Sequence, residues 1–502
     1  MRVKPLMSIL LLALLLANIL LGCQSEQDKI YDELTKDSSS TGLSSQIEEL
    51  SSLEEDDLKG ELTLIDTYTG DRNVGLPAIA QEFMKLHPKV QIKIEAGIPV
   101  SELETPGAYE NFMQQIAVEL MSGEAPDIMG TLGNLTPRDC ASANLLYDLY
   151  QWMEQDENFV LDDYYRNLFE ALEYDGKLFT LPIGFSCDVV FLNQHILDGL
   201  GIKLEPWDSL DYTDILSISR QAEEEGLVAE DYTLEYMGLN SGYSLFYQVE
   251  IPDFINMQES TVRFDSPEFI DYLNATKGIL SSQEMDGSVV TLSGSKFVNE
   301  FAESNESSNT SLFFKTSIGL EDLTTLAYPP EGCVGPLLLT SRQGTVAFYP
   351  SPALSVPTSC KDPELAWEFL KFCIAPVEKA AYWNQYRPDG SVDIARGVLP
   401  VAKENMRAYG DLYAQICAAR EEKQSGGTTS FAPNTSDSPL VQPFWDNFSE
   451  FVSSANATKG YYFGLSTIVD PILLDFYRTD SLSPENCAKL MQEKAGLYFG
   501  ER

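Results

Sequence analysis

The chain is poor in histidine and in positive charge. Its 502 residues include two histidines, His87 and His195, and 33 lysines and arginines against 77 acids, so the formal net charge is −44. So few histidines argue against a histidine-rich metal site, and they leave only two candidates for the histidine of a catalytic triad. Nucleic acid and anionic lipid surfaces both attract clustered basic side chains, so neither is an expected partner.

The cysteine spacing indicates neither a disulfide framework nor a metal site. No C-x-x-C spacing occurs, so neither a zinc site nor a redox pair is indicated, and we expect no metal and no cofactor. Apart from Cys23, the number of cysteines is odd (8 − 1 = 7), and we predict no specific disulfide. Cys373 shares a helical face with Phe369 and Leu370, which predicts a small buried side chain.

The first residues resemble an export signal. Arg2 and Lys4 precede an apolar run over 6–22, which is short for a membrane-spanning helix but suits the core of a signal peptide. The run ends in Leu-Leu-Gly-Cys23, which resembles the bacterial lipobox, in which the cysteine is lipidated. We therefore expect a lipoprotein signal peptide over 1–22 and a palmitate-type membrane anchor at Cys23. The alternative is an uncleaved N-terminal anchor.

Residues 23–60 are expected to form a tether. The segment is rich in serine and acids and has no sustained helical stripe. Such a composition buries too little apolar area to offset the entropy of ordering, which predicts a disordered linker. The linker would hold the folded part away from the membrane.

Order is expected from residue 61, in a strand–helix alternation. Strands are predicted over 62–65, 90–94 and 126–129, and helices from 76 and over 109–121 between them. This order is typical of a parallel α/β layer, where ligands bind beyond the carboxyl ends of the strands. The loop 67–73 and the stretch 130–134 are therefore candidate binding segments.

After residue 134 the strand–helix alternation is less regular. Strands are predicted near 178–182, 189–192 and 346–350, and a helix begins at Pro363 with Asp362 as its cap. A final helix carries Phe444, Phe448, Phe451 and Ala455 on one face. Residues 205–310 are aromatic and acidic, with no clear period.

Several short segments, in this order, resemble the extracellular solute-binding proteins of ABC importers, in the family 1, sugar-binding branch. The matching segments are G-E-A-P-D-I at 123–128, D-G-K-L-F-T-L-P at 175–182, V-F-L-N at 190–193, V-R-F-D-S-P-E-F at 262–269, W-E-F-L-K-F at 367–372 and G-V-L-P at 397–400. Each is weak alone, but their order along 61–450 and the lipobox make the set more specific.

The resemblance implies an α/β, two-lobed type II periplasmic-binding-protein fold with discontinuous lobes. The lobes would comprise 61–183 plus 352–397, and 186–350 plus 400–502. Crossover strands would join them near 183–186, 348–351 and 397–400. Ligand would lie in the cleft between the lobes.

The resemblance also implies ligand contacts in the first loop. Gly70-Asp71-Arg72 matches a family loop that touches sugar hydroxyls, and a carboxylate beside a guanidinium offers acceptors and fixed donors. An exposed ion pair at a loop tip is an equally weighted alternative. Tyr68 would offer a ring face to a sugar, or else be an aromatic at the edge of the core.

Further predicted contacts are Thr131, Asn134, Ser186 and Tyr349. Ser186 stands where the family has a sugar-facing carboxylate, and Thr131 and Asn134 stand where it has an aromatic, so the hydrogen-bond set must differ. Asp127 is predicted to be structural.

Trp445 completes the predicted site. It lies one residue, or about 100°, off the apolar stripe of its helix, so packing alone does not explain it. The family has a Phe-Trp pair at this point, and its tryptophan lies against a sugar ring. The alternative is a tryptophan wedged between helices.

Together these observations predict a lipid-anchored extracytoplasmic receptor rather than an enzyme. It would bind a carbohydrate, as a monomer, and deliver it to an ABC permease. One alternative is a sensor that presents ligand to a membrane receptor. Another is a glycoside hydrolase, because a sequence with 77 acids does not exclude the two carboxylates that such an enzyme needs.

Overall fold

The computed structural model describes most of the chain after the predicted tether. The described residues are 58–65, 68–69, 75–95, 97–99, 105, 107–132, 135–228, 242–256, 259–277, 312–329, 332–375, 398–408, 410–411, 440–459, 463–479 and 481–500. Cys23, Asp71, Arg72 and Asn134 lie outside them, and of Tyr68 only the backbone is described. None of the helices in these ranges is long and apolar enough to cross a bilayer.

The first layer is the predicted strand–helix alternation. Its sheet has the order β3-β1-β5 with parallel pairing, and β1 begins at Gly60, two residues before the predicted strand over 62–65. The strands are β1 (Gly60–Ile65), β3 (Val90–Glu95) and β5 (Ile128–Met129), and the connecting helices are α4 (Gly75–Leu86) and α5 (Ala108–Ser122). Gly123 ends α5 with a φ of 75°, a conformation that favours glycine. The predicted order is confirmed.

A helix from much later in the chain covers this sheet. α16 (Pro363–Ile374) begins at the predicted residue, and Asp362 Oδ1 accepts a hydrogen bond from the Leu365 N–H at 3.0 Å. Its Phe369 lies edge-on to Phe83 of α4, with ring centroids 5.4 Å apart. Cys373 is fully buried, as predicted. Two segments about 300 residues apart therefore share one core.

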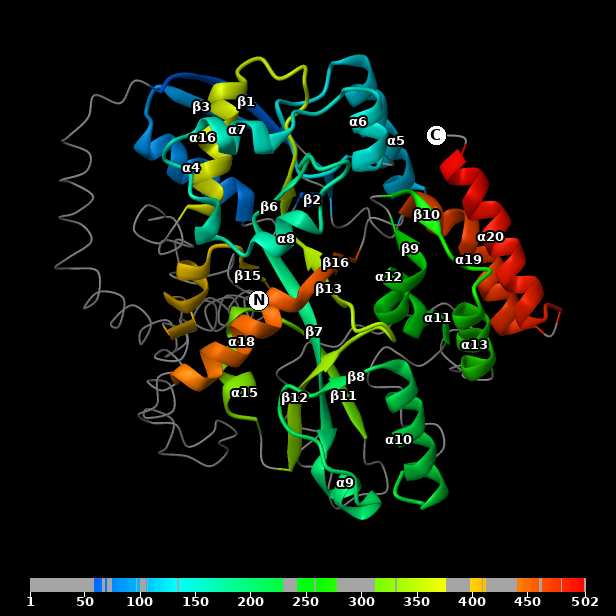
Figure 1. Ribbon diagram of the computed structural model, residues 1–502. Helices are drawn as coiled ribbons and strands as arrows, with labels where there is room; N and C mark the ends of the chain where they lie inside the picture. The colour runs from blue at the N-terminus through cyan, green and yellow to red at the C-terminus, as the bar shows by residue number, and fades with distance from the viewer. Residues whose placement is uncertain are drawn as a thin grey trace, which may run out of the picture.

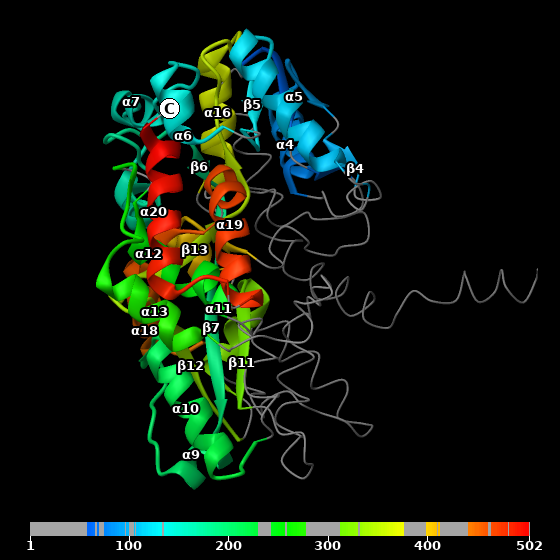
Figure 2. The same ribbon diagram turned by 90° about the vertical axis from the view of Figure 1, so that its right-hand side faces the viewer.

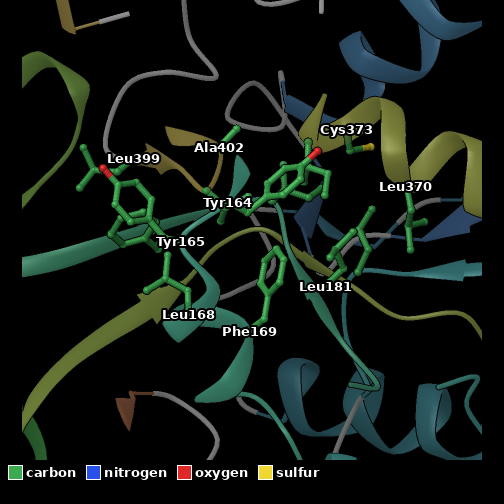
Figure 3. Packing of buried hydrophobic residues seen from close by; sticks show 14 of the residues in the cluster. Tyr164, Tyr165, Leu168, Phe169, Leu181, Leu370, Cys373, Leu399 and Ala402 are labelled. Carbon is green, nitrogen blue, oxygen red and sulfur yellow. The ribbon is translucent and has the colours of Figure 1, made fainter. Parts of the chain in front are cut away.

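Shorter elements lie around the first sheet and α16. They are β2 (Tyr68–Thr69), β4 (Ile98–Pro99), α6 (Pro137–Ser142), α7 (Leu149–Gln155), η2 (Leu161–Asp163) and α8 (Arg166–Glu170). Figure 3 shows part of the buried cluster, including Tyr164, Tyr165, Leu168, Phe169, Leu181, Leu370, Cys373, Leu399 and Ala402. The cluster continues from α16 down to the strands that follow.

A second, mixed sheet is organised around β7. Its order is β16-β13-β7-β12-β8, and β11 and β15 also pair with β7. The strands are β7 (Gly184–Asn193), β8 (Ser209–Leu210), β11 (Phe313–Ile318), β12 (Cys333–Leu339), β13 (Val346–Pro350), β15 (Leu399–Pro400) and β16 (Ala455–Thr458). The predicted strand over 346–350 is confirmed.

Helices and a small hairpin surround this second sheet. They are α9 (Gln194–Leu200), α10 (Tyr212–Glu224), α11 (Gly242–Leu245), η4 (Phe246–Glu250), α12 (Ile251–Phe254), β9 (Ile255–Asn256), β10 (Thr261–Val262), α13 (Pro267–Thr276), η6 (Leu320–Asp322), α15 (Leu323–Ala327), α18 (Gln442–Ser454), α19 (Phe463–Arg478) and α20 (Pro484–Gly500). A second hydrophobic cluster forms around Phe246, Phe269, Tyr272 and Phe313. In Figure 1, β1, β3 and α16 lie at one end of the molecule and α9 and α10 at the other, and β7 runs between them. Figure 2 shows the same separation from the side.

The three predicted crossing segments meet at Gly184. β13 pairs with Ser186 and its neighbours, and β15 pairs with Gly184 and Phe185. Just above, β14 (Ala353–Leu354) pairs with β6 (Leu181–Pro182). A Cβ on Gly184 would lie 3.0 Å from the Ser351 carbonyl oxygen and 3.2 Å from that of Leu399. The chain thus passes between the two ends of the molecule along closely packed strands.

α18 sits with the first cluster rather than the second. Its Phe444, Phe448 and Phe451 share a buried cluster with residues of β1 and α16. The predicted lobe of 400–502 includes this helix, and the lobe boundaries stay a prediction.

Candidate ligand-binding site

The side chains of β7 alternate between two different environments. Phe185, Cys187, Val189 and Phe191 point into the first cluster, and Val190 and Leu192 point into the second. Ser186 and Asp188 share the face of Val190 because side chains alternate along a strand. On that face, the apolar lining therefore gives way to polar side chains near the crossing.

These polar side chains continue across the neighbouring strands. In register, Ser317 of β11 lies opposite Asp188, and Tyr349 of β13 lies opposite Ser186. Lys315 lies two residues before Ser317, and Lys459 directly follows β16, the strand that pairs with β13. We call this set the polar strip: Ser186, Asp188, Lys315, Ser317, Tyr349 and Lys459.

Asp188 is the centre of the polar strip. Its side chain has no exposed surface, and its Oδ2 accepts hydrogen bonds from Lys315 Nζ at 3.1 Å and Lys459 Nζ at 2.9 Å. Ser317 Oγ donates to the other carboxylate oxygen. Burial by itself raises the pKa of Asp188, but both lysine charges and these hydrogen bonds outweigh it, so the pKa lies far below its usual range. Asp188 is therefore ionised at any physiological pH.

Tyr349 and Ser186 flank this ion cluster. Lys459 Nζ lies 5.1 Å from the centroid of the Tyr349 ring, within the range of a cation–π contact. Burial and the nearby Asp188 charge raise the pKa of Tyr349 to about 12, so its hydroxyl stays protonated. Within the described residues, neither the Ser186 nor the Tyr349 hydroxyl has a hydrogen-bond partner, and both residues are partly exposed. Both hydroxyls are thus available to a ligand.

The structure brings together two of the predicted site residues and adds four. Ser186 and Tyr349 are a directly opposed pair, whereas Asp188, Lys315, Ser317 and Lys459 were missed. One signal was present, because an aspartate inside the apolar strand F-S-C-D-V-V-F is a buried charge that needs a cationic partner. The identity of its partners was not readable from the pattern.

The first layer holds the remaining described candidates. Thr131 follows β5, and its hydroxyl donates to the Met113 sulfur at 3.6 Å. The backbone of Tyr68 pairs with Ile98 of β4. Asp127 accepts hydrogen bonds from Thr63 and from the Lys361 N–H, which fits its predicted structural role. A ligand contact by Thr131 or Tyr68 stays a prediction.

Trp445 lies in the hydrophobic interior. It is 6% exposed, and its ring centroid is 5.3 Å from that of Phe444 and 6.1 Å from that of Phe448. A Cβ on Gly410 would approach its ring to 2.5 Å. Its Nε1 has no hydrogen-bond partner within the described part of the chain. This environment fits the packing alternative, and a ligand contact stays a prediction.

A second polar cluster joins α11 and η4 to α19. Tyr243 Oη donates to Asp470 Oδ2 at 3.0 Å, and Tyr247 donates to the other oxygen. Burial raises the pKa of Asp470 above its usual range despite both hydrogen bonds. Because both hydroxyls bind the carboxylate, this cluster holds α11 and η4 against α19. Across the described ranges, no group of three or more His, Cys, Asp or Glu side chains could hold a metal ion.

Comparison with known proteins identifies the fold. No protein-family model and no curated protein sequence matches the chain. Among solved structures, the ABC substrate-binding protein of Listeria monocytogenes in complex with cycloalternan matches with a TM-score of 0.52 and 16% identity, covering 88% of this chain and 100% of that one. The cyclic alpha-maltosyl-1,6-maltose binding protein of Arthrobacter globiformis matches with 0.50 and 15%, covering 89% and 100%.

This chain has the two-lobed fold of extracellular solute-binding proteins. The GacH receptor of Streptomyces glaucescens, solved unliganded and with acarbose, agrees, with a TM-score of 0.50 and 15% identity over 88% of this chain and 99% of that one. The predicted fold class is confirmed, and so is the predicted resemblance at the level of the fold. The polar strip lies on the strands that cross between the two ends of this solute-binding fold.

Proposed function

We propose that the chain is a lipid-anchored, extracytoplasmic receptor that captures a carbohydrate between its lobes and delivers it to an ABC permease. The observation that carries the proposal is the polar strip, a built set of donors and acceptors beside the crossing strands of a solute-binding fold. The unpaired hydroxyls of Ser186 and Tyr349 are the groups that a sugar would engage. The matched solved proteins are binding proteins, several of them for sugars, and this supports a receptor over an enzyme.

A ligand screen tests the carbohydrate assignment. The purified full chain in mild detergent is examined by thermal shift against oligosaccharides, peptides and amino acids. A ligand at 100 times its dissociation constant should stabilise the folded state by about 2.7 kcal/mol. A screen in which only peptides or amino acids raise the melting temperature would refute the assignment.

Tyr349→Phe tests whether the strip is the site. The substitution removes one hydroxyl and keeps the ring beside Lys459. We expect ligand affinity to fall about three- to tenfold, the usual effect of one net hydrogen bond, with unchanged stability. Tyr150→Phe is the matched control, because its hydroxyl bonds Glu173 in the first layer and should leave affinity unchanged. Equal affinity of Tyr349→Phe and wild type would remove Tyr349 from the site.

Lobe motion and membrane anchoring have their own tests. Ligand should close the lobes about the strands that meet at Gly184, so small-angle scattering should show compaction at saturation. Identical curves with and without a verified ligand would indicate a rigid cleft. In cells, labelled palmitate should enter the wild-type chain but not Cys23→Ser, and equal labelling of both would exclude Cys23 as the anchor.

A further inference from the structure

The polar strip carries more positive charge than its own carboxylate requires. Lys315 and Lys459 both bind the same oxygen of Asp188, and within the described residues neither lysine pairs with any other acid. Two ammonium groups against one carboxylate leave a net charge of +1 (2 − 1). The side chains of the two lysines are only 12% and 5% exposed, so water screens this excess charge weakly.

Burying a second lysine destabilises the folded state unless another interaction compensates for its desolvation. One ammonium already neutralises Asp188, and desolvating a second one adds a further free-energy penalty. Each lysine has three N–H donors, and within the described residues each uses one of them on Asp188. Lys315 lies on the same face of the sheet as Ser186 and Tyr349, and Lys459 Nζ lies 5.1 Å from the centroid of the Tyr349 ring. This arrangement would be completed by an anion.

Only the local charge of the polar strip can attract an anion, because the net charge of the whole chain repels anions. A net charge of −44 repels anionic solutes at long range. A neutral sugar would need no excess of ammonium groups beneath it, whereas a carboxylate accepts charge-assisted hydrogen bonds from lysine and hydroxyl donors together.

We propose that the polar strip binds an anionic group of the solute, so that the ligand is an acidic sugar such as a uronic acid or its oligomer. This inference rests on the proposed function, since it specifies the class of carbohydrate. Lys315 and Lys459 bind the ligand carboxylate, and the Ser186 and Tyr349 hydroxyls donate to it or to neighbouring sugar oxygens.

Matched pairs of ligands test the charge itself. Oligogalacturonides are compared with the same oligomers after methyl esterification, glucuronate-bearing xylo-oligosaccharides with the unsubstituted chains, and glucuronate with glucose. Thermal shift and calorimetry are run on the full chain at physiological salt. We expect at least one acidic member to bind tenfold or more tightly than its neutral partner.

Two variants connect that preference to the strip. Lys315→Gln leaves Asp188 paired with Lys459 and makes the strip neutral, so the preference should fall to near one while the melting temperature changes little. Lys93→Gln removes an exposed lysine paired with Glu95 and is the control that should keep the preference. Thermal unfolding of each variant without ligand verifies that it is folded.

The outcomes separate this inference from the function on which it rests. Neutral sugars that bind as well as or better than their acidic partners, or a preference that survives both Lys315→Gln and Lys459→Gln, would overturn the inference and leave a sugar receptor in place. A panel in which no acidic member stabilises the chain beyond its neutral partner overturns it too. Stabilisation by peptides alone would overturn both.

Discussion

Glu250 should make the protein less stable as the pH rises from mildly acidic to mildly basic. This glutamate ends the η4 segment and has no exposed surface. Its Oε2 accepts a hydrogen bond from the Arg342 N–H at 3.3 Å, whereas Oε1 has no partner in the described part of the chain. Burial, with the nearby Asp253 and Asp211 charges, raises the pKa of Glu250 from 4.5 to about 8.

The sign and size of the effect follow from the two pKa values. The folded state holds the Glu250 proton more tightly than the unfolded state does, so stability falls as the pH rises from 4.5 toward 8. Integrated between about pH 5.5 and about pH 8.5, this single group lowers the free energy of unfolding by about 3 kcal/mol. Asp470, whose pKa is also raised by burial, acts with the same sign. Asp188 acts with the opposite sign, but only at far more acidic pH.

Glu250→Gln isolates the contribution, because an amide copies the neutral acid and never ionises. Urea unfolding followed by tryptophan fluorescence at a series of pH values should show equal stability of the two proteins near pH 5 and a more stable variant at higher pH. Glu124→Gln, an exposed glutamate, is the matched control and should follow the wild type. Parallel pH profiles of wild type and Glu250→Gln, or a wild-type stability that rises with pH, would refute the reasoning.

Three further substitutions test the packing and the ion cluster. Trp445→Ala should lower the unfolding free energy by about 3–5 kcal/mol if the indole is core, with unchanged ligand affinity, whereas a loss of affinity with little loss of stability would return it to the site. Gly184→Ala should destabilise the folded state by about 1–3 kcal/mol, because its methyl group would press on two backbone carbonyls. Gly496→Ala is the control and should be neutral or slightly stabilising, because nothing lies within 4 Å of the added methyl group. Equal effects of the two substitutions in urea unfolding would contradict the packing at Gly184. Asp188→Asn should lower the free energy of unfolding by about 3–5 kcal/mol, because it leaves two buried lysines unpaired. Adding Lys459→Met should recover part of that loss. A single variant as stable as the wild type would show that the cluster is better hydrated than its burial indicates.

The local pattern of the sequence was enough for the first layer. β1, α4, β3 and α5 follow from apolar spacing and stop signals within some 60 residues, and each lies where the pattern predicts. α16 was equally readable, since Asp362 and Pro363 mark its start. What the pattern lacked was the partner of each element: nothing local says that α16 packs against α4.

The irregular middle of the chain contains helices that the sequence did not reveal. α10 and α13 lie within 205–310, where no period was recognised. α13 buries Phe269, Tyr272 and Leu273 together with Thr276, so aromatic and polar side chains share its buried face. Such a face weakens the apolar period from which helices are predicted.

Trp445 shows how little one offset from an apolar stripe can decide. Its predicted ligand contact depends on a narrow apolar stripe, from which a residue about 100° away would need another explanation. α18 in fact buries Phe444, Trp445, Phe448, Phe451 and Val452, which is a wide face between neighbouring elements. A one-residue offset therefore does not separate a core residue from a ligand-facing one.

The polar strip was beyond local reasoning because its members are distant in sequence. Lys315 is 127 residues from Asp188, and Lys459 is 271 residues away. They meet because β11 and β13 pair with opposite edges of β7, and β16 extends the sheet past β13. Only the sheet order places them on one face.

That sheet order also joins binding to lobe motion. Gly184, where the crossing strands meet, is two residues from Ser186, and Tyr349 directly precedes Pro350 at the end of β13. A solute held by Ser186 and Tyr349 would therefore lie beside the backbone segments that must change direction when the lobes close. The Asp188 ion cluster links β7 to β11 and to Lys459, which directly follows β16. It follows that substitutions in the polar strip should alter ligand affinity and the extent of closure together. Substitutions in the Tyr243–Asp470 cluster, which joins α11 and η4 to α19, should alter neither.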